Sequence, residues 1–211
     1  MHVKTSTCDS NHDVRAFTRN KEGHLVSGTG LALCARHALV RKNSVGDLQK
    51  GERYAFVSAY CIEAESFAIT RYCNMDFIVF SALIGCVVLR ILITYDIACQ
   101  WSRNLATRLE SYPEDMRIDL DQVDVETAIP SFRIRAHGSK CQQAFALAFL
   151  LYVARTAGEE VKTGWAYMNV ASPSVQEMAP AHHESLNDHW GGWNFQKTVT
   201  FSESSDIFVL S

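Results

Sequence analysis

Blocks of apolar positions separated by polar turns run along this chain of 211 residues. Residues 23–41 alternate glycine-rich turns with apolar runs, which predicts a β-hairpin, and a polar loop over 42–54 follows it. Residues 77–99 are almost wholly apolar and predict a helix over roughly 75–87 and a buried, parallel-type strand over about 89–95. Because an arginine and an aspartate interrupt this stretch, we interpret it as part of a core rather than as a membrane span.

The second half of the chain continues the alternation of helix and strand. A helix follows the predicted strand, and the acidic residues 111–128 are typical of a solvated linker. Residues 129–134 are predicted to form a second buried strand, and the almost wholly apolar residues 141–157 a long core helix. Beyond Trp165 the chain is turn-rich and aromatic, and its histidine-rich residues 182–189 are interpreted as a solvated loop. This order of elements indicates an α/β fold with a mixed sheet.

Composition narrows the class of protein without identifying it. Apolar residues make up 47% of the chain and charged residues 20%, which is the balance of a soluble globular protein of one domain or a little more. The formal net charge is only −3, so any contact with nucleic acid has to come from a local patch. The polar N-terminus predicts no secretion signal, and the sequence contains no Walker A loop, dinucleotide fingerprint or nucleophile elbow.

Asp96 is the strongest candidate for chemistry, because it directly follows a predicted buried strand and precedes a helix. Ligands gather at the carboxyl ends of such strands, and carboxylates hold the divalent metals of two-metal nucleases. The alternative is an aspartate that caps the following helix. Glu159 and Glu160, at the end of the long apolar helix, could turn toward the same metal or be ordinary surface glutamates.

Pairs of cysteine and histidine offer a second kind of metal site. Cys34 and His37 have C-x-x-H spacing, which lets one short loop present two ligands to Zn²⁺. The nearest candidates to complete four ligands are Cys8, His12 and Cys73. His137 and Cys141 form a second pair, four residues apart at a helix start. For both pairs the alternative is a core cysteine packed beside a hydrogen-bonded histidine.

Several long motifs occur in a fixed order, namely GLALCARHALVRKNSVGDLQKGERY, YCNMDF, ITYDIACQWSRNL, IPSFRIRAHGSKCQ, GEEVKTGWAYMNVASPSVQEMAP and LNDHWGGWNFQKT. Together they cover nearly the whole chain and resemble the KDZ (Kyakuja-Dileera-Zisupton) DNA transposases of fungal type. The resemblance implies an RNase H-like fold whose carboxylates bind Mg²⁺ or Mn²⁺ and cleave and join phosphodiester bonds. It implies that Asp96 is the family's second catalytic carboxylate. It also implies a nuclear protein that binds transposon ends and target DNA, and a homo-oligomer is compatible with this role.

Three departures from the family pattern predict a partial, degenerate copy. The first strand of the fold, with the first catalytic aspartate, is expected upstream of Met1. In the family motif G-E-x-x-E-R-x-W, Glu159 matches the first glutamate, but Lys162 stands at the second, where a cation would repel Mg²⁺. Residues 55–72 are an extra stretch bracketed by repeated Arg-Tyr pairs, which fits an in-frame intron translated as protein.

We therefore expect an RNase H-like mixed sheet flanked by helices, without its first strand and with a turn-rich aromatic C-terminal segment. The expected segments are 1–54 with a zinc-binding hairpin, the insertion 55–72, the remaining catalytic core 73–170, and the aromatic segment 171–211. The expected function is that of a transposase catalytic fragment that is inactive alone. The alternative is a zinc-stabilised module that binds DNA or protein without catalysis. Catalytic metal would be held by Asp96, Glu159 and Glu160, and structural Zn²⁺ by Cys34, His37, Cys8 and Cys73.

Overall fold

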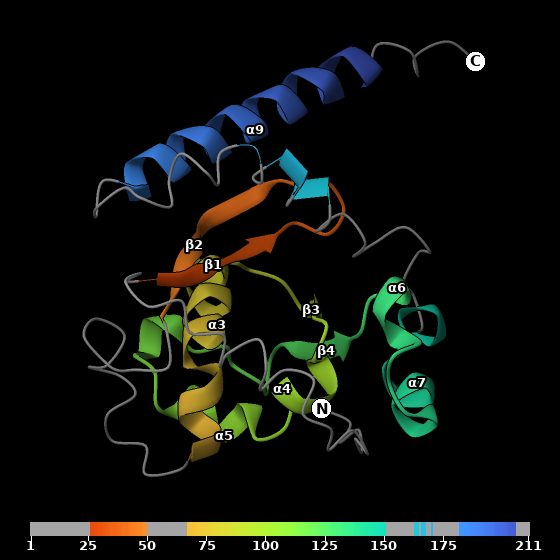
Figure 1. Cartoon of the computed structure of the whole chain (residues 1–211). Helices are drawn as coiled ribbons and strands as arrows, with labels where there is room; N and C mark the ends of the chain where they lie inside the picture. Colours follow the sequence, from red (N-terminus) through yellow and green to blue (C-terminus); the bar gives the residue numbers. More distant parts are fainter. Residues whose placement is uncertain are drawn as a thin grey trace. The chain divides into compact units, whose positions relative to one another are not determined.

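A computed structural model describes residues 26–49, 67–150, 163–164, 166–167, 170 and 182–205. The chain divides into two compact units. Unit 1 consists of Met1–Ala32 and Lys42–Arg155, and unit 2 of Leu33–Arg41 and Thr156–Ser211. Small sheets and helices make up the described residues (Figure 1), which confirms the predicted α/β class at this level.

The predicted hairpin is present, and its second strand is longer than expected. β1 (Val26–Leu33) and β2 (Val40–Gln49) form a two-stranded sheet, so β2 extends well into the polar stretch predicted to be a loop. Within unit 1, β2 packs closely against α3 (Phe67–Leu83), because a Cβ added at Gly46 would lie 2.9 Å from Cγ1 of Ile78. The polar stretch therefore becomes a strand through packing on a helix that is remote in the sequence.

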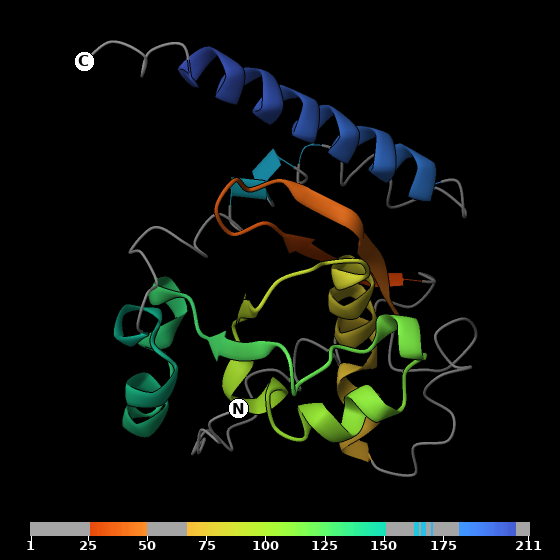
Figure 2. The ribbon, with the colours of Figure 1, turned by 180° about the vertical axis from the view of Figure 1, so that it is seen from behind.

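A second two-stranded sheet lies in unit 1. β3 (Arg90–Thr94) confirms the predicted buried strand, and it pairs in parallel with β4 (Asp124–Ala128). Arg90 is aligned with Asp124 and Thr94 with Ala128, so the carboxyl ends of both strands lie at the same edge. In both ribbon views α4 and α5 lie below this pair, and Figure 2 shows it from behind.

The position of β4 corrects two predictions. β4 lies within the acidic stretch predicted to be a linker, and it takes the place of the strand predicted over 129–134. Its buried positions include Val125 and Thr127, while Glu126 is only half-buried and pairs with the Arg90 guanidinium at 2.5 Å. This cross-strand pair offsets the charge that made the stretch look like solvated surface. The predicted strand over 129–134 is wrong, because a short helix, α6 (Ser131–Ile134), begins there after Pro130.

The helices of unit 1 differ from the predicted ones in length. α3 covers most of the helix predicted over 75–87, but it begins earlier and ends at Leu83. The single helix expected after β3 is two short helices, α4 (Ala98–Trp101) and α5 (Leu105–Glu110). Asn104, with a φ of 55°, separates them in the left-handed region of backbone space. A short 3₁₀ helix, η1 (Glu114–Met116), precedes β4.

The long apolar helix predicted over 141–157 is also wrong within the described residues. α7 (Ser139–Phe145) ends where Ala146 adopts an extended conformation and forms a parallel bridge with Ile129, and η2 (Leu147–Phe149) follows. The bridge continues the sheet edge beyond β4. An apolar stretch of sequence can contribute to the core without forming a single helix. Here the chain changes from helical to extended conformation and so reaches the sheet edge. The part of the run after residue 150 lies outside the described residues.

A buried ion pair connects α3 to α4 and α5. Asp76 is fully buried, and its carboxylate accepts hydrogen bonds at 2.6 Å from both Arg108 Nε and Trp101 Nε1. The Arg108 guanidinium also donates to the carbonyl of Trp101 at 2.7 Å and to that of Arg103 at 2.5 Å, and it lies 5.2 Å from the centre of the Tyr72 ring. Every part of this pair has a partner, which is the condition for burying charge at low cost.

Unit 2 contains a long helix where the sequence predicted turns and a loop. α9 spans His182–Ser205, so the histidine-rich stretch is helical. Leu186, Trp190 and Trp193 are buried along it, at the spacing of one helical face. Trp193 Nε1 donates to the carbonyl of Ala38 at 2.8 Å, so this face packs on the hairpin turn. None of the helices in the described part of the chain is long and apolar enough to span a bilayer.

Replacing Asn194 with alanine is expected to loosen the hairpin turn from α9. The Asn194 amide accepts a hydrogen bond from the Val40 N–H at 2.8 Å and donates to the Val40 carbonyl at 2.9 Å. At about 1 kcal/mol for each bond, the loss should speed hydrogen exchange of the Val40 amide by roughly tenfold or more. Gln196→Ala, at an exposed position of the same helix, should leave that exchange rate unchanged; equal acceleration in both variants would contradict the assignment.

Candidate metal centre

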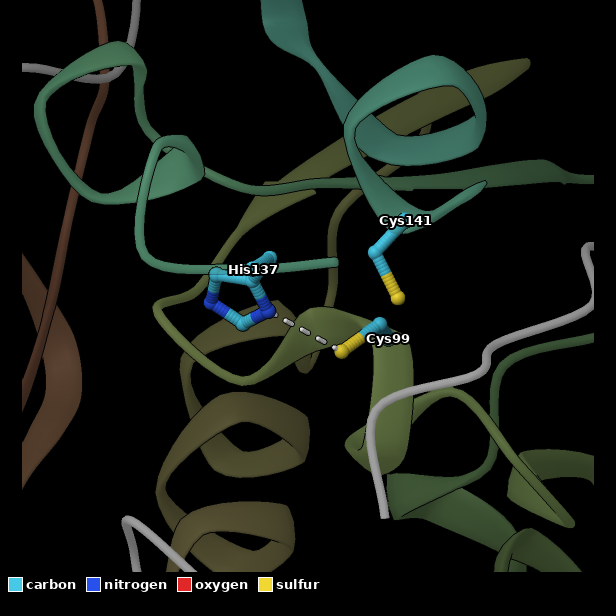
Figure 3. A group of neighbouring side chains, drawn as sticks. All are labelled: Cys99, His137 and Cys141. Carbon is cyan, nitrogen blue, oxygen red and sulfur yellow. Dashed lines mark hydrogen bonds between the residues drawn. The ribbon is translucent and has the colours of Figure 1, made fainter. Parts of the chain in front are cut away.

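Three potential metal ligands converge in unit 1. The sulfur atoms of Cys99 and Cys141 and a ring nitrogen of His137 all lie within 4.8 Å of one another. Figure 3 shows the two thiols and the imidazole ring pointing toward a common space. Cys99 and Cys141 are buried, and His137 is half-buried. We call these three residues the Cys-His-Cys cluster.

Parallel strand pairing explains why residues so far apart in the sequence meet. Cys99 lies in α4, just after β3, whereas His137 follows the turn of α6 that comes after β4. Because β3 and β4 end at the same edge, the segments that follow them share a location. Cys141, in the first turn of α7, follows His137 by one helical turn. The Ile129 N–H donates to the Phe145 carbonyl at 2.8 Å and holds α7 at this edge.

The spacing and chemistry of the cluster suit a zinc ion. Cysteine and histidine are the preferred ligands of Zn²⁺, and ligands at about 2.0–2.3 Å from a tetrahedral ion lie roughly 3.3–3.8 Å apart. The Cys99 sulfur and the His137 Nδ1 are 3.6 Å apart. The cluster supplies three ligands from the described residues, and a tetrahedral zinc site takes one more.

Asp96 lies beside this cluster at the carboxyl end of β3, as the sequence predicts for that edge. Its Oδ2 is 3.0 Å from Arg133 Nε, and both side chains are about half exposed, at 44% for Asp96 and 56% for Arg133. The N-cap position of α4 is Ile97, which makes no side-chain capping hydrogen bond. A half-exposed carboxylate at a sheet edge is accessible to a hydrated metal ion, and the neighbouring guanidinium is accessible to an anion such as phosphate.

A sequence profile of the Kyakuja-Dileera-Zisupton (KDZ) transposases matches residues 1–70 and 67–194 of the chain. The chain belongs to this family. The second matched segment contains Asp96 and the whole Cys-His-Cys cluster. The two segments overlap at 67–70, inside the stretch predicted as an insertion. No curated protein and no solved structure matches the chain.

Three of the other predicted cysteine and histidine ligands lie within the described residues. Cys34 Sγ and His37 Nδ1 are 3.4 Å apart at the hairpin turn of unit 2, so the C-x-x-H spacing does bring these two side chains together. Cys73 lies in α3 of unit 1, where it is buried and disulfide-bonded. The other predicted ligands lie outside the described residues: Cys8, His12, Glu159 and Glu160.

Cys99 is the one member of the cluster that the sequence analysis of the KDZ chain missed. His137 and Cys141 were predicted as a pair because they are close in the sequence. Cys99 lies 38 positions before His137 and meets it only through the pairing of β3 with β4. The sequence feature that could have indicated Cys99 as a ligand is its position three residues after Asp96, on the same strand-to-helix segment.

Proposed function

We propose that this chain carries part of the catalytic domain of a DNA transposase that cleaves and joins phosphodiester bonds with divalent metal. The main support is the position of Asp96, which lies half exposed at the carboxyl edge of the β3–β4 pair in a chain of the KDZ transposase family. An RNase H-like sheet places a metal-binding carboxylate at such an edge. Duplex DNA, as transposon end and as target, is the proposed substrate.

Asp96 would hold Mg²⁺ or Mn²⁺, with Glu159 and Glu160 as the proposed further carboxylates. When bound, such a metal polarises the phosphoryl group and stabilises charge on the attacking and leaving oxygens. Arg133 holds the Asp96 carboxylate in place through the 3.0 Å contact and brings a fixed positive charge to the same edge. Its guanidinium is suited to orienting a non-bridging phosphate oxygen.

The Cys-His-Cys cluster would hold a structural Zn²⁺ that fixes α4, α6 and α7 to the sheet edge. Since Asp96 and Cys99 are three residues apart, metal binding at the cluster would also limit the motion of Asp96. The proposed catalytic site is incomplete in this chain alone, because Lys162 replaces a glutamate of the family motif. We therefore expect metal-dependent nicking that is weak but measurable.

Asp96→Asn tests the catalytic role. Nicking of supercoiled plasmid by the full chain with Mn²⁺ or Mg²⁺ should fall by about 100-fold or more, because a metal contributes several kcal/mol and 1.36 kcal/mol corresponds to tenfold in rate. Asp124→Asn is the matched control, since Asp124 is an exposed carboxylate at the opposite end of the strand pair. Nicking that survives Asp96→Asn would refute the role of Asp96.

The second candidate function is a zinc-stabilised module that binds DNA or protein without catalysis. The Cys-His-Cys cluster favours it, because this site needs no carboxylate. Tight zinc binding together with no metal-dependent nicking by the wild-type chain would select this function over the first.

A further inference from the structure

A local excess of positive charge lies on the segment that carries two of the three cluster residues. Residues 127–150 contain Arg133, Arg135 and Lys140 and no aspartate or glutamate. The whole chain has a formal charge of −3, so the rest of it is strongly acidic by comparison. Such a segregation of charge creates a positive potential over one part of the surface, where the average composition shows none.

These positive side chains are exposed around one turn. Arg133 belongs to α6, Arg135 immediately follows it, and Lys140 lies in the first turn of α7; all three residues are exposed. In Figure 1 α6 and α7, coloured green to teal, follow the end of β4. We call residues 131–140 the basic turn.

The basic turn is held in a defined conformation. His137 contributes to the Cys-His-Cys cluster from within it, and Cys141 does so immediately after it. The Gln142 side-chain amide donates to the His137 carbonyl at 2.6 Å, and the Gln142 N–H donates to the Gly138 carbonyl at 3.0 Å. Positive groups on a fixed turn lose less conformational freedom on binding than they would on a flexible tail.

The acidic groups near the turn neutralise only part of its charge. Asp96 Oδ2 lies 3.0 Å from Arg133 Nε and offsets the charge of that guanidinium, whereas within the described part of the chain neither Arg135 nor Lys140 forms an ion pair. Arg135 and Lys140 are therefore suited to contacts with an anionic polymer. A phosphodiester backbone presents one negative charge per nucleotide of each strand and can contact several surface cations at once.

We propose that the basic turn is a contact surface for the phosphate backbone of duplex DNA, with Arg135 and Lys140 as the phosphate-binding residues. This inference rests on the proposed function, which supplies DNA as the partner. It adds the location of the contact, on the turn whose Arg133 pairs with Asp96, and it assigns backbone positioning rather than base recognition to the turn.

The test is the salt dependence of DNA affinity for the full chain. Each of Arg135→Gln and Lys140→Gln should weaken binding to a fluorescently labelled duplex and reduce the slope of log K against log salt by about 1, because one fewer counterion is released. Lys42→Gln is the matched control, since Lys42 is an exposed lysine on β2. Circular dichroism and Co²⁺ binding at the cluster report whether each variant keeps its fold.

The outcomes separate this inference from the proposed function. A reduced slope in both turn variants, with an unchanged slope in the control, supports the basic turn. Wild-type slope and affinity in both turn variants, or an equal reduction in all three variants, overturns it and leaves DNA as the substrate. No binding of duplex DNA by the wild-type chain overturns the proposed function and the basic turn together.

Discussion

Replacing Asp76 with alanine should lower the free energy of unfolding by about 3–5 kcal/mol, because it leaves the Arg108 guanidinium buried without a counter-charge. Both side chains of this pair are almost completely buried, at 1% exposure for Asp76 and 2% for Arg108. The change also removes the acceptor of the Trp101 indole N–H. Urea denaturation of the full chain measures the loss, and Asp115→Ala, at an exposed position of η1, is the control and should change stability little.

A double variant distinguishes the contribution of the ion pair to stability from that of side-chain packing. Burial raises the pKa of the Asp76 carboxyl, while hydrogen bonding and charge from Arg108, and then the bond from Trp101, oppose that rise. Asp76→Leu combined with Arg108→Met removes both charges at similar volume, and it should recover much of the stability lost in Asp76→Ala. A loss below about 1 kcal/mol for Asp76→Ala would show that the pair contributes little.

Replacing Cys99 with serine is expected to weaken zinc binding by roughly 100-fold. Structural zinc sites with four ligands bind with about 10–16 kcal/mol, or about 3 kcal/mol for each ligand. Titration with Co²⁺, followed by its thiolate charge-transfer absorption, measures the affinity and shows that sulfur is a ligand. Cys141→Ser should have the same effect, because both sulfur atoms belong to one group of ligands.

Two cysteines outside the cluster provide controls for this experiment. Cys86 is half-buried and forms no disulfide, and Cys86→Ser should leave the Co²⁺ affinity unchanged. Cys34→Ser removes the sulfur that lies beside His37, so it shows whether that pair holds a second ion. Co²⁺ affinity that is the same in Cys99→Ser as in the wild type would rule out the Cys-His-Cys cluster as a zinc site.

Local sequence patterns were sufficient to predict the elements whose conformation is determined mainly by their own residues. The continuous apolar run of β3 and the glycine-rich hairpin are of this kind. β4 was missed because its acidic residues look like solvated surface until Arg90 of the neighbouring strand is placed opposite them. α9 was missed because two glycines and many polar residues surround its three buried anchors, Leu186, Trp190 and Trp193.

In the candidate site, too, residues that are close in the sequence were predicted and a residue that only the fold brings close was not. Asp96 was predicted because a strand end and its carboxylate are adjacent in the sequence, and the i, i+4 pair His137 and Cys141 because one helical turn joins them. Cys99 could not be added from spacing alone, since only the parallel pairing brings α4 to α7. The positive charge of the basic turn can be recognised in the sequence. That the turn lies close to Asp96 is known only from the contact of Arg133 with Asp96 in the structure.

The parallel pairing of β3 with β4 has a consequence for how unit 1 folds. Arg90 and Asp124 are aligned although 33 residues separate them, and α4, α5 and η1 all lie in the connection. Closing such a loop costs chain entropy before any strand contact is gained, so sheet formation depends on the connection becoming compact first. The Asp76–Arg108 ion pair fastens that connection to α3 and so restricts the chain between the two strands. The stability of the strand pair is therefore expected to depend on this buried ion pair, although none of its residues lies in either strand.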